Sequence, residues 1–126
     1  EIGGLEIGCR GQLREHAHPA ELKEILDRTL DTDTQLFGWD SSPVRTVAVV
    51  SGSGADAVEQ CRREGIDALI TGEVGHADAH PIRQSGVTVL AAGHYRTEVP
   101  GVQAVYTILS DAFDLDCRFV DIPTGL

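Results

Sequence analysis

The sequence predicts an α/β fold with three layers, α/β/α, built around a mostly parallel or mixed sheet with a final edge strand. Short runs rich in β-branched residues alternate with segments of helical apolar spacing, which is typical of βαβ units. The chain has 126 residues, of which 41% are hydrophobic, so it is long enough for one domain with a real core. We therefore expect residues 1–126 to form a single α/β domain.

The first expected helix covers residues 19–30, where apolar side chains recur at helical spacing and Pro19 stands near the start. Residues 31–43 are rich in Asp, Thr and Ser, which is typical of a connection. Within this connection, residues 35–37 (Gln, Leu, Phe) could form a short strand. The region thus leads from one helix into the sheet.

Three buried strands are expected at residues 44–50, 67–71 and 87–92, because each is a short apolar run rich in β-branched residues. Helices are expected between and after them, at residues 55–64 and 78–84, which end at Gly65 and Gly86, and at residues 99–113.

The last part of the chain carries two amphipathic patterns. In the helix expected at residues 99–113, apolar side chains that include Val102, Val105 and Ile108 lie on one stripe. Residues 116–122 then alternate polar and apolar side chains, as a strand with one wet face does. This alternation predicts a strand at an edge of the sheet.

Parallel strands joined by right-handed crossovers have their carboxyl ends at one side of the sheet, where open α/β folds bind ligands. Three glycine-bearing turns meet there, at residues 51–54, 71–73 and 93–94. The turns bring one histidine and two acidic residues to this edge, which is where we expect the functional site.

His94 and Glu98 are candidate metal ligands, four residues apart after a buried strand. An imidazole nitrogen with a carboxylate oxygen suits zinc, iron, manganese or cobalt, whereas calcium and magnesium prefer oxygen throughout. Since Pro100 follows, Glu98 is expected in the first turn of the last helix, with Thr97 or a neighbour as the cap and the helix dipole favouring its ionised form. The alternative is that His94 binds the backbone of the turn while Glu98 only caps the helix.

Two further groups at the same edge are weaker candidates. Glu73 follows a strand and a glycine, and could be a catalytic residue, as a general base, or an acid that supports a metal ligand. The turn Ser51, Gly52, Ser53 and Gly54 could bind a substrate phosphate through its backbone amides. It lacks the lysine of a P-loop, and the alternative is an ordinary tight turn between strand and helix.

The composition excludes several classes of partner. The net charge is −10 and Lys23 is the only lysine, so we expect no nucleic-acid partner held through phosphates. No apolar run has the roughly 20 residues of a membrane-spanning helix, and the first residues lack a secretion signal, so we expect a cytoplasmic protein without membrane contact. The chain begins without methionine, and we expect it to be part of a longer protein.

Four motifs occur in an order and spacing that resembles a known family: TGEV at residues 71–74, AAGHYRTE at 91–98, PGV at 100–102 and FVDIP at 119–123. Together they resemble the carboxyl-terminal half of the GTP cyclohydrolase 1 type 2 homologues, also called NGG-one-interacting-factor-three-like proteins. The resemblance covers residues 44–123 and, more loosely, residues 3–30.

This resemblance implies a two-metal centre between two α/β halves in a ring-shaped homo-oligomer, with His94 and Glu98 as ligands. It also implies a metal-dependent hydrolase that acts on a small-molecule substrate. The family's amino-terminal half, with its histidine pair and aspartate, has no counterpart in this chain, so only half of the centre is expected here. The alternatives are a non-catalytic regulatory or scaffold module and a nucleotide-binding module that uses the glycine-rich turn.

Overall fold

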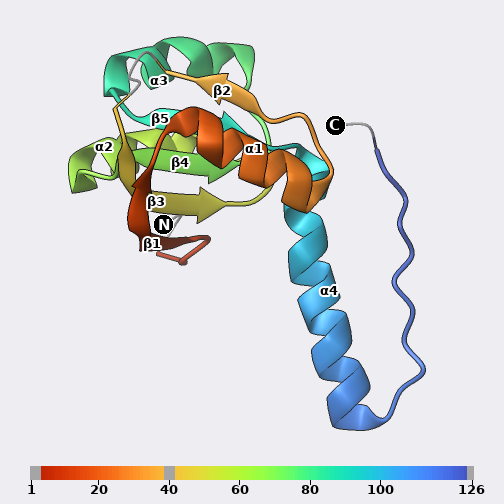
Figure 1. Ribbon diagram of the computed structural model, residues 1–126. Coiled ribbons are helices and arrows are strands. Elements are labelled where there is room, and N and C mark those ends of the chain that lie inside the picture. The colour runs from red at the N-terminus through yellow and green to blue at the C-terminus, as the bar shows by residue number, and fades with distance from the viewer. Residues whose placement is uncertain (1–3, 39–41, 125–126) are drawn as a thin grey trace.

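A computed structural model of the chain describes residues 4–38 and 42–124, and Figure 1 shows its elements. Strands and helices alternate along the chain, except that strands β2 and β3 follow one another directly. Their order is β1 (Cys9–Ala17), α1 (Pro19–Leu30), β2 (Gln35–Phe37), β3 (Val44–Val50), the 3₁₀ turn η1 (Ala55–Ala57), α2 (Val58–Glu64), β4 (Ala68–Thr71), the 3₁₀ turn η2 (His76–Asp78), α3 (Ala79–Ser85), β5 (Thr88–Ala91) and α4 (His94–Phe113).

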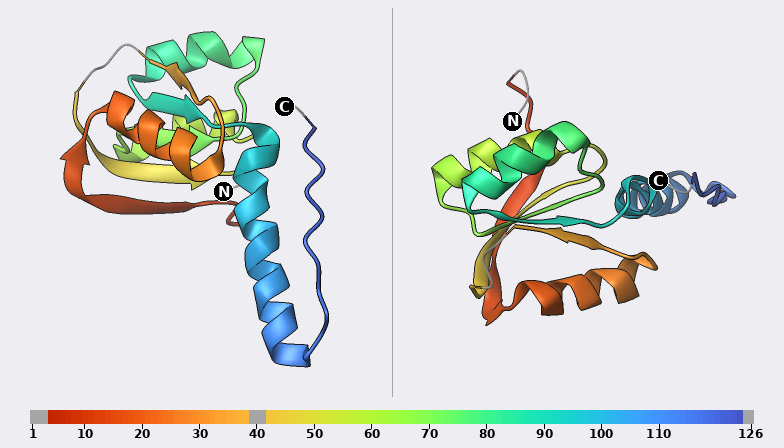
Figure 2. Two further views of the ribbon diagram at one scale, coloured as in Figure 1. Left: turned by 45° about the vertical axis from the view of Figure 1, so that its right-hand side comes forward. Right: turned by 90° about the horizontal axis from the view of Figure 1, so that it is seen from above.

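The five strands form one mixed sheet in the order β1-β3-β4-β5-β2. The three central strands are parallel, and the two edge strands, β1 and β2, run antiparallel to their neighbours. Helices α2 and α3 cover one face of the sheet and α1 covers the other (Figure 2). The predicted three-layer α/β architecture is therefore confirmed, and the carboxyl ends of the parallel strands lie at one edge.

The core consists of two layers, one on each face of the sheet. Successive residues of a strand point to opposite faces, so Leu69 and Val89 pack towards α2 and α3 while Ala68 and Leu90 pack towards α1. All four side chains are fully buried. Because the central strands are covered on both faces, their sequences are nearly continuous apolar runs.

The central strands, β2 and the first three helices lie where the sequence predicts them, with boundaries shifted by a few residues at most. Strand β1 was not predicted. Its sequence, CRGQLREHA, has little apolar alternation because most of its side chains are exposed at the sheet edge. The strand is held by antiparallel pairing with β3, which a polar sequence can make as well as an apolar one.

Helix α4 begins at His94, five residues before the predicted start at Val99. Gly93, with a φ of 87°, turns the chain out of β5, and the carbonyl of Gly93 accepts the first helical hydrogen bond from the amide of Thr97 at 3.0 Å. Thr97 therefore lies inside the helix and is not its cap, and Glu98 is not in the first turn. Pro100 lies within the helix rather than at its start, which is where the prediction was wrong.

The predicted edge strand at residues 116–122 is also wrong, because residues 115–124 form no strand. Helix α4 leaves the body of the protein, and the tail returns alongside it (Figure 1). The tail meets the body at Tyr95, whose hydroxyl donates to Asp121 at 2.6 Å and accepts from the amide of Ile122 at 2.9 Å. The edge strands of the sheet are β1 and β2, and the tail pairs with neither of them.

In the part of the chain that the structure describes, no helix is both long and apolar enough to cross a membrane.

Candidate metal centre

The turns after β3, β4 and β5 converge on the peptide of Gly52. Its carbonyl oxygen accepts hydrogen bonds from the hydroxyl of Thr71 at 3.2 Å and from the amides of Gly72 at 2.8 Å and Glu73 at 3.2 Å. Its N–H donates to the hydroxyl oxygen of Thr97 on α4 at 3.0 Å. One peptide thus ties two turns of the sheet edge to the beginning of the last helix.

His94 and Glu98 lie on the same face of α4, one turn apart. The Nε2 atom of His94 is 3.3 Å from Oε1 of Glu98, and the two side chains are 34% and 53% exposed. We expected the pair to converge from a strand end and a helix start, but both residues belong to one helix. The structure therefore brings the two predicted ligands together and leaves them open to solvent on one side.

Glu73 contacts the other nitrogen of the same ring, with 3.1 Å between its Oε1 and Nδ1 of His94. Hydrogen bonds from Ser53 and from His94 lower the pKa of the Glu73 carboxyl, so the group is ionised and can only accept. In the neutral tautomer of His94 that carries its proton on Nδ1, the ring donates to this carboxylate. A carboxylate that accepts from one nitrogen of an imidazole is the usual support for a histidine that binds metal through its other nitrogen.

In this tautomer the remaining nitrogen, Nε2, carries a lone pair and faces the carboxylate of Glu98. Two acceptor atoms 3.3 Å apart repel each other unless a proton or a cation lies between or beside them. This pairing of a histidine nitrogen with a carboxylate oxygen matches the preferences of a borderline divalent metal.

Glycines make the close approach of these residues possible. A Cβ atom on Gly52, whose φ is 65°, would lie 2.8 Å from Oε1 of Glu98 and 3.2 Å from Nε2 of His94. A Cβ atom on Gly72 would lie 2.6 Å from the carbonyl oxygen of Gly52 and 2.7 Å from Cα of His94. A larger residue at Gly72 would push α4 away from the turns, whereas one at Gly52 would displace the side chains of Glu98 and His94.

The centre is incomplete within the described residues. Residues 4–38 and 42–124 contain no group of three or more His, Cys, Asp or Glu side chains arranged to hold a metal ion. Glu73 and Glu98 lie on opposite nitrogens of His94, so they do not face one common point. His94 and Glu98 together offer two ligands, whereas a zinc site generally has three or four protein ligands.

The turn that we considered as a phosphate contact, residues 51–54, has two of its four amides engaged within the protein. The N–H of Gly52 donates to Thr97 and the N–H of Gly54 donates to Thr71, both at 3.0 Å. Ser53 is exposed but makes a hydrogen bond to Glu73. These contacts support a structural role for the turn.

Sequence reasoning missed the two threonines that hold this site. Thr71 is fully buried, and its hydroxyl accepts from the amide of Gly54 and donates to the carbonyl of Gly52. The hydroxyl of Thr97 accepts from the amide of Gly52 and donates to the carbonyl oxygen of His94 at 3.0 Å. A polar β-branched residue that directly precedes a glycine turn, as Thr71 does, is the signal that could have indicated the first of them.

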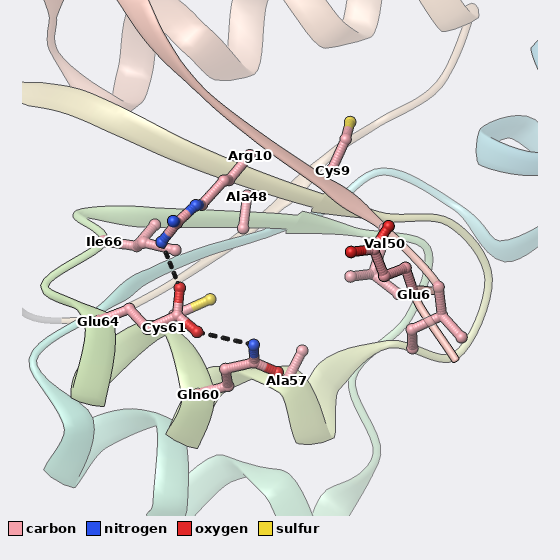
Figure 3. Close-up of a pocket in the computed structure, with 12 residues that line it drawn as sticks. Glu6, Cys9, Arg10, Ala48, Val50, Ala57, Gln60, Cys61, Glu64 and Ile66 are labelled. Atoms are coloured by element: carbon pink, nitrogen blue, oxygen red, sulfur yellow. Dashed lines mark hydrogen bonds and ion pairs between the residues drawn. The ribbon is translucent and has the colours of Figure 1, made fainter. Parts of the chain in front are cut away.

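Two hollows lie near the sheet. The larger, about 540 Å³, opens beside Glu73 and is lined in part by Gly93, Tyr95 and Arg96. The other, about 270 Å³, lies between β1 and α2. Figure 3 shows it with the buried thiol of Cys61 in its wall, and none of the candidate ligands lines it.

The family described as Duf34/NIF3 (NGG1p interacting factor 3) matches residues 3–124. The chain belongs to the DUF34/NIF3 family. Among curated DUF34/NIF3 relatives, the chain is 38% identical over 127 residues to a GTP cyclohydrolase 1 type 2 homolog of Pyrococcus abyssi. It is also 38% identical over 126 residues to the protein of the same name from Halobacterium salinarum.

Solved structures agree with this assignment. The protein ybgI, described as of unknown function, superposes with a TM-score of 0.88 over 95% of this chain at 32% identity. A Thermus thermophilus protein superposes with a TM-score of 0.78 over 93% of the chain at 31% identity, and a Bacillus cereus protein related to NIF3 with 0.78 over 94% at 27%. The α/β fold is thus shared with these proteins.

The chain spans about half the length of the relatives that it matches. The match covers 100% of this chain but 50% of the Pyrococcus abyssi protein, and 95% of this chain but 49% of the ybgI chain. The family resemblance inferred from the GHYRTE and FVDIP segments is confirmed, and the relatives contain a further region of similar length.

Proposed function

We propose that this chain contributes His94 and Glu98 to a divalent-metal centre of a metal-dependent hydrolase. The observation that carries the proposal is the pair of acceptor atoms, Nε2 of His94 and Oε1 of Glu98, at 3.3 Å, with the other nitrogen of the ring held by Glu73. A cation beside this pair removes the repulsion between the acceptors. We further propose that the remaining ligands come from outside these 126 residues.

A bound divalent metal would polarise the substrate and lower the pKa of a bound water. Glu73 orients His94 and fixes its proton on Nδ1. We assign Glu73 to positioning rather than to general-base catalysis, because its pKa is lowered, whereas an effective base has a pKa near the working pH. The hollow of about 540 Å³ beside Glu73 offers space for a small-molecule substrate.

Several properties implied by the resemblance remain predictions: a second metal ion, the choice among zinc, iron, manganese and cobalt, and a homo-oligomer. The alternative is a non-catalytic regulatory or scaffold protein with the same metal ligands. The two functions differ in what the loss of Glu98 would cause. In a hydrolase that consequence is loss of turnover, whereas in a scaffold it is only loss of metal.

The first test is a titration of cobalt(II) into this chain combined with a protein half that supplies the remaining ligands, followed by visible absorption and by calorimetry. Glu98→Gln keeps the shape of the side chain but removes a charged ligand, so we expect the cobalt affinity to fall by about tenfold or more. Glu73→Gln should lower the affinity by roughly 10-fold to 100-fold, because the orientation of His94 is lost.

The matched control is Glu24→Gln, which makes the same change of charge at an exposed position of α1 away from the site. We expect its cobalt affinity to equal that of the unmodified chain. Equal affinities for Glu98→Gln and Glu24→Gln would refute the proposed ligand pair. In a protein that also supplies the remaining ligands, full turnover by the Glu98→Gln variant would exclude the proposed role of Glu98, whereas bound metal without turnover in the unmodified protein would favour the scaffold.

A further inference from the structure

The hollow of about 540 Å³ lies where four segments meet: the connection ahead of β2, the turns after β4 and β5, and the first turn of α4. Its volume is within the range of ordinary small-molecule sites, roughly 300–1,000 Å³. Among the described residues that line it, the charged side chains are one guanidinium, that of Arg96, and three carboxylates, those of Asp31, Asp33 and Glu73. The hollow thus presents charges of both signs.

Arg96 is held firmly at its base and bound loosely at its tip. Its Cβ and Cγ atoms lie 3.5 Å and 3.7 Å from the place that a Cβ on Gly93 would take, so the base of the side chain packs against the turn. Within the described chain the guanidinium makes one hydrogen bond, to Asp31 at 3.2 Å, and that carboxylate is 93% exposed.

A ligand can take the place of Asp31 on Arg96 at small cost. An exposed ion pair contributes little to stability, and Asp31 returns to water when it is displaced. A guanidinium has five N–H donors in a planar fork and binds a carboxylate through two parallel hydrogen bonds. Arg96 therefore suits one anionic group of a ligand.

The carboxylates determine what else the ligand must carry. Asp33 forms an ion pair with Lys23, which is not among the lining residues, and this lysine also pairs with a second acid. Asp31 becomes free to accept once a ligand displaces it from Arg96. Ionised carboxylates can only accept hydrogen bonds, so they attract an ammonium group and repel further negative charge. The hollow therefore favours a ligand with a positive group beside its single negative one.

We propose that the hollow binds a small zwitterion, such as an amino acid or a short peptide, with its carboxylate on Arg96 and its ammonium group among the acidic side chains. A nucleotide is disfavoured, because its several phosphate charges would meet three carboxylates and one guanidinium. As a substrate site the hollow rests on the proposed hydrolase function, and Arg96 is then a residue that determines specificity. The binding itself requires no metal.

The test follows the amide chemical shifts of the isotope-labelled chain at neutral pH, in buffer that contains a metal chelator. Glycylglycine carries both charges, N-acetylglycine only the carboxylate, and glycinamide only the ammonium group. We expect glycylglycine to cause saturable shifts at residues 31–35, 72–74 and 93–96, and the other two probes to bind at least tenfold more weakly. Absence of these shifts would overturn the proposal, as would equal or tighter binding of N-acetylglycine, glycinamide or GTP.

A pair of variants tests the role of Arg96. Arg96→Gln removes the guanidinium, and we expect the affinity for glycylglycine to fall at least tenfold. The control, Arg63→Gln, makes the same change of charge at an exposed position of α2 and should keep the affinity of the unmodified chain. Equal affinities in the two variants would overturn the assignment of the carboxylate to Arg96. The dispersion of the amide spectrum establishes that each variant is folded.

A second pair tests the acidic side. Asp31→Asn with Asp33→Asn should abolish the preference for glycylglycine over N-acetylglycine, because the ammonium group loses its acceptors. The control is Asp114→Asn with Asp116→Asn, outside the hollow. Asp114 has a φ of 50° where Asp31 has 54°, which asparagine tolerates, and Asp116 belongs to an exposed ion pair as Asp33 does. An unchanged preference in the first variant would overturn the assignment of the ammonium group.

The zwitterion site and the metal centre fail separately. Cobalt binding at His94 and Glu98 without any response to glycylglycine would leave the proposed function and overturn the zwitterion site. Binding of glycylglycine to a protein that does not bind cobalt would support the zwitterion site and refute the metal centre.

Discussion

Gly52 is the residue on which the geometry of the candidate centre depends most directly. Its carbonyl and amide bind groups from two other segments, and its Cα lies against both His94 and Glu98. Its φ of 65° is in the left-handed region, which side-chain-bearing residues rarely adopt. Glycine is therefore favoured at position 52 for two separate reasons, its backbone conformation and the lack of space for a Cβ.

These two reasons can be separated by comparing Gly52→Ala with Gly65→Ala. Gly65 also has a φ of 65°, but a Cβ there would meet nothing within 4 Å. We expect each variant to lose about 1–3 kcal/mol of unfolding free energy from backbone strain. Only Gly52→Ala should also lower the cobalt affinity, since its Cβ displaces both ligands. The measurements are urea unfolding and cobalt titration, and an unchanged affinity in Gly52→Ala would show that the ligands do not lie against this glycine.

At the residue scale, the sequence predicted which side chains meet but not how they are oriented. His94 and Glu98 could be chosen because they follow a buried strand at the edge where the turns converge. The assignment of Glu73 to Nδ1 depends on side-chain torsions and on the hydrogen bond from Ser53, which no spacing encodes. The role of Thr97 was missed because the helix start was placed after it.

At the element scale, prediction succeeded where burial determines the sequence. Strands β3, β4 and β5 are covered on both faces, so their apolar runs are unambiguous. It failed for β1 and for the tail, whose structure depends on pairing partners. Strand β1 pairs through its backbone despite a polar sequence, whereas the tail pairs with neither edge strand despite its alternating sequence.

The start of α4 was predicted wrongly for a different physical reason. Pro100 lacks an N–H, so the sequence pattern treated it as an early position of a new helix. The tight contact of α4 with Gly72 and the hydrogen bond between Thr97 and Gly52 instead hold an additional turn ahead of the proline. Tertiary contacts thus extend the helix and place His94 and Glu98 on one face.

The central strands should carry most of the stability, and Leu90 in β5 tests this. Leu90 is fully buried in the layer beneath α1, so Leu90→Ala should lower the free energy of unfolding by about 2–5 kcal/mol. Its register partner on edge strand β2, Leu36, is 45% exposed, and Leu36→Ala should cost markedly less. Urea unfolding of both variants checks the difference, and equal losses would contradict the layered core.

At the scale of the whole molecule, the chain combines a buried sheet with a projection that buries nothing. The two core layers involve the sheet and helices α1, α2 and α3, whereas α4 contributes no buried side chain. A helix gains most of its stability from packing of an apolar face rather than from its intrinsic propensity. The outer turns of α4 therefore depend on a surface that the described chain does not supply.

Native-state hydrogen exchange should reveal this division in the isolated chain. Amides of β4, paired on both sides by parallel strands, should exchange slowest, near the free energy of global unfolding. Amides of residues 102–113 should exchange far faster, since local opening of the outer turns exposes no core. The turn at residues 94–98 should be intermediate, because Thr97 and Tyr95 fasten it to Gly52 and to the tail. Protection of residues 102–113 as strong as that of β4 would mean that α4 is already covered in the isolated chain, and its exposed apolar face would then need another explanation.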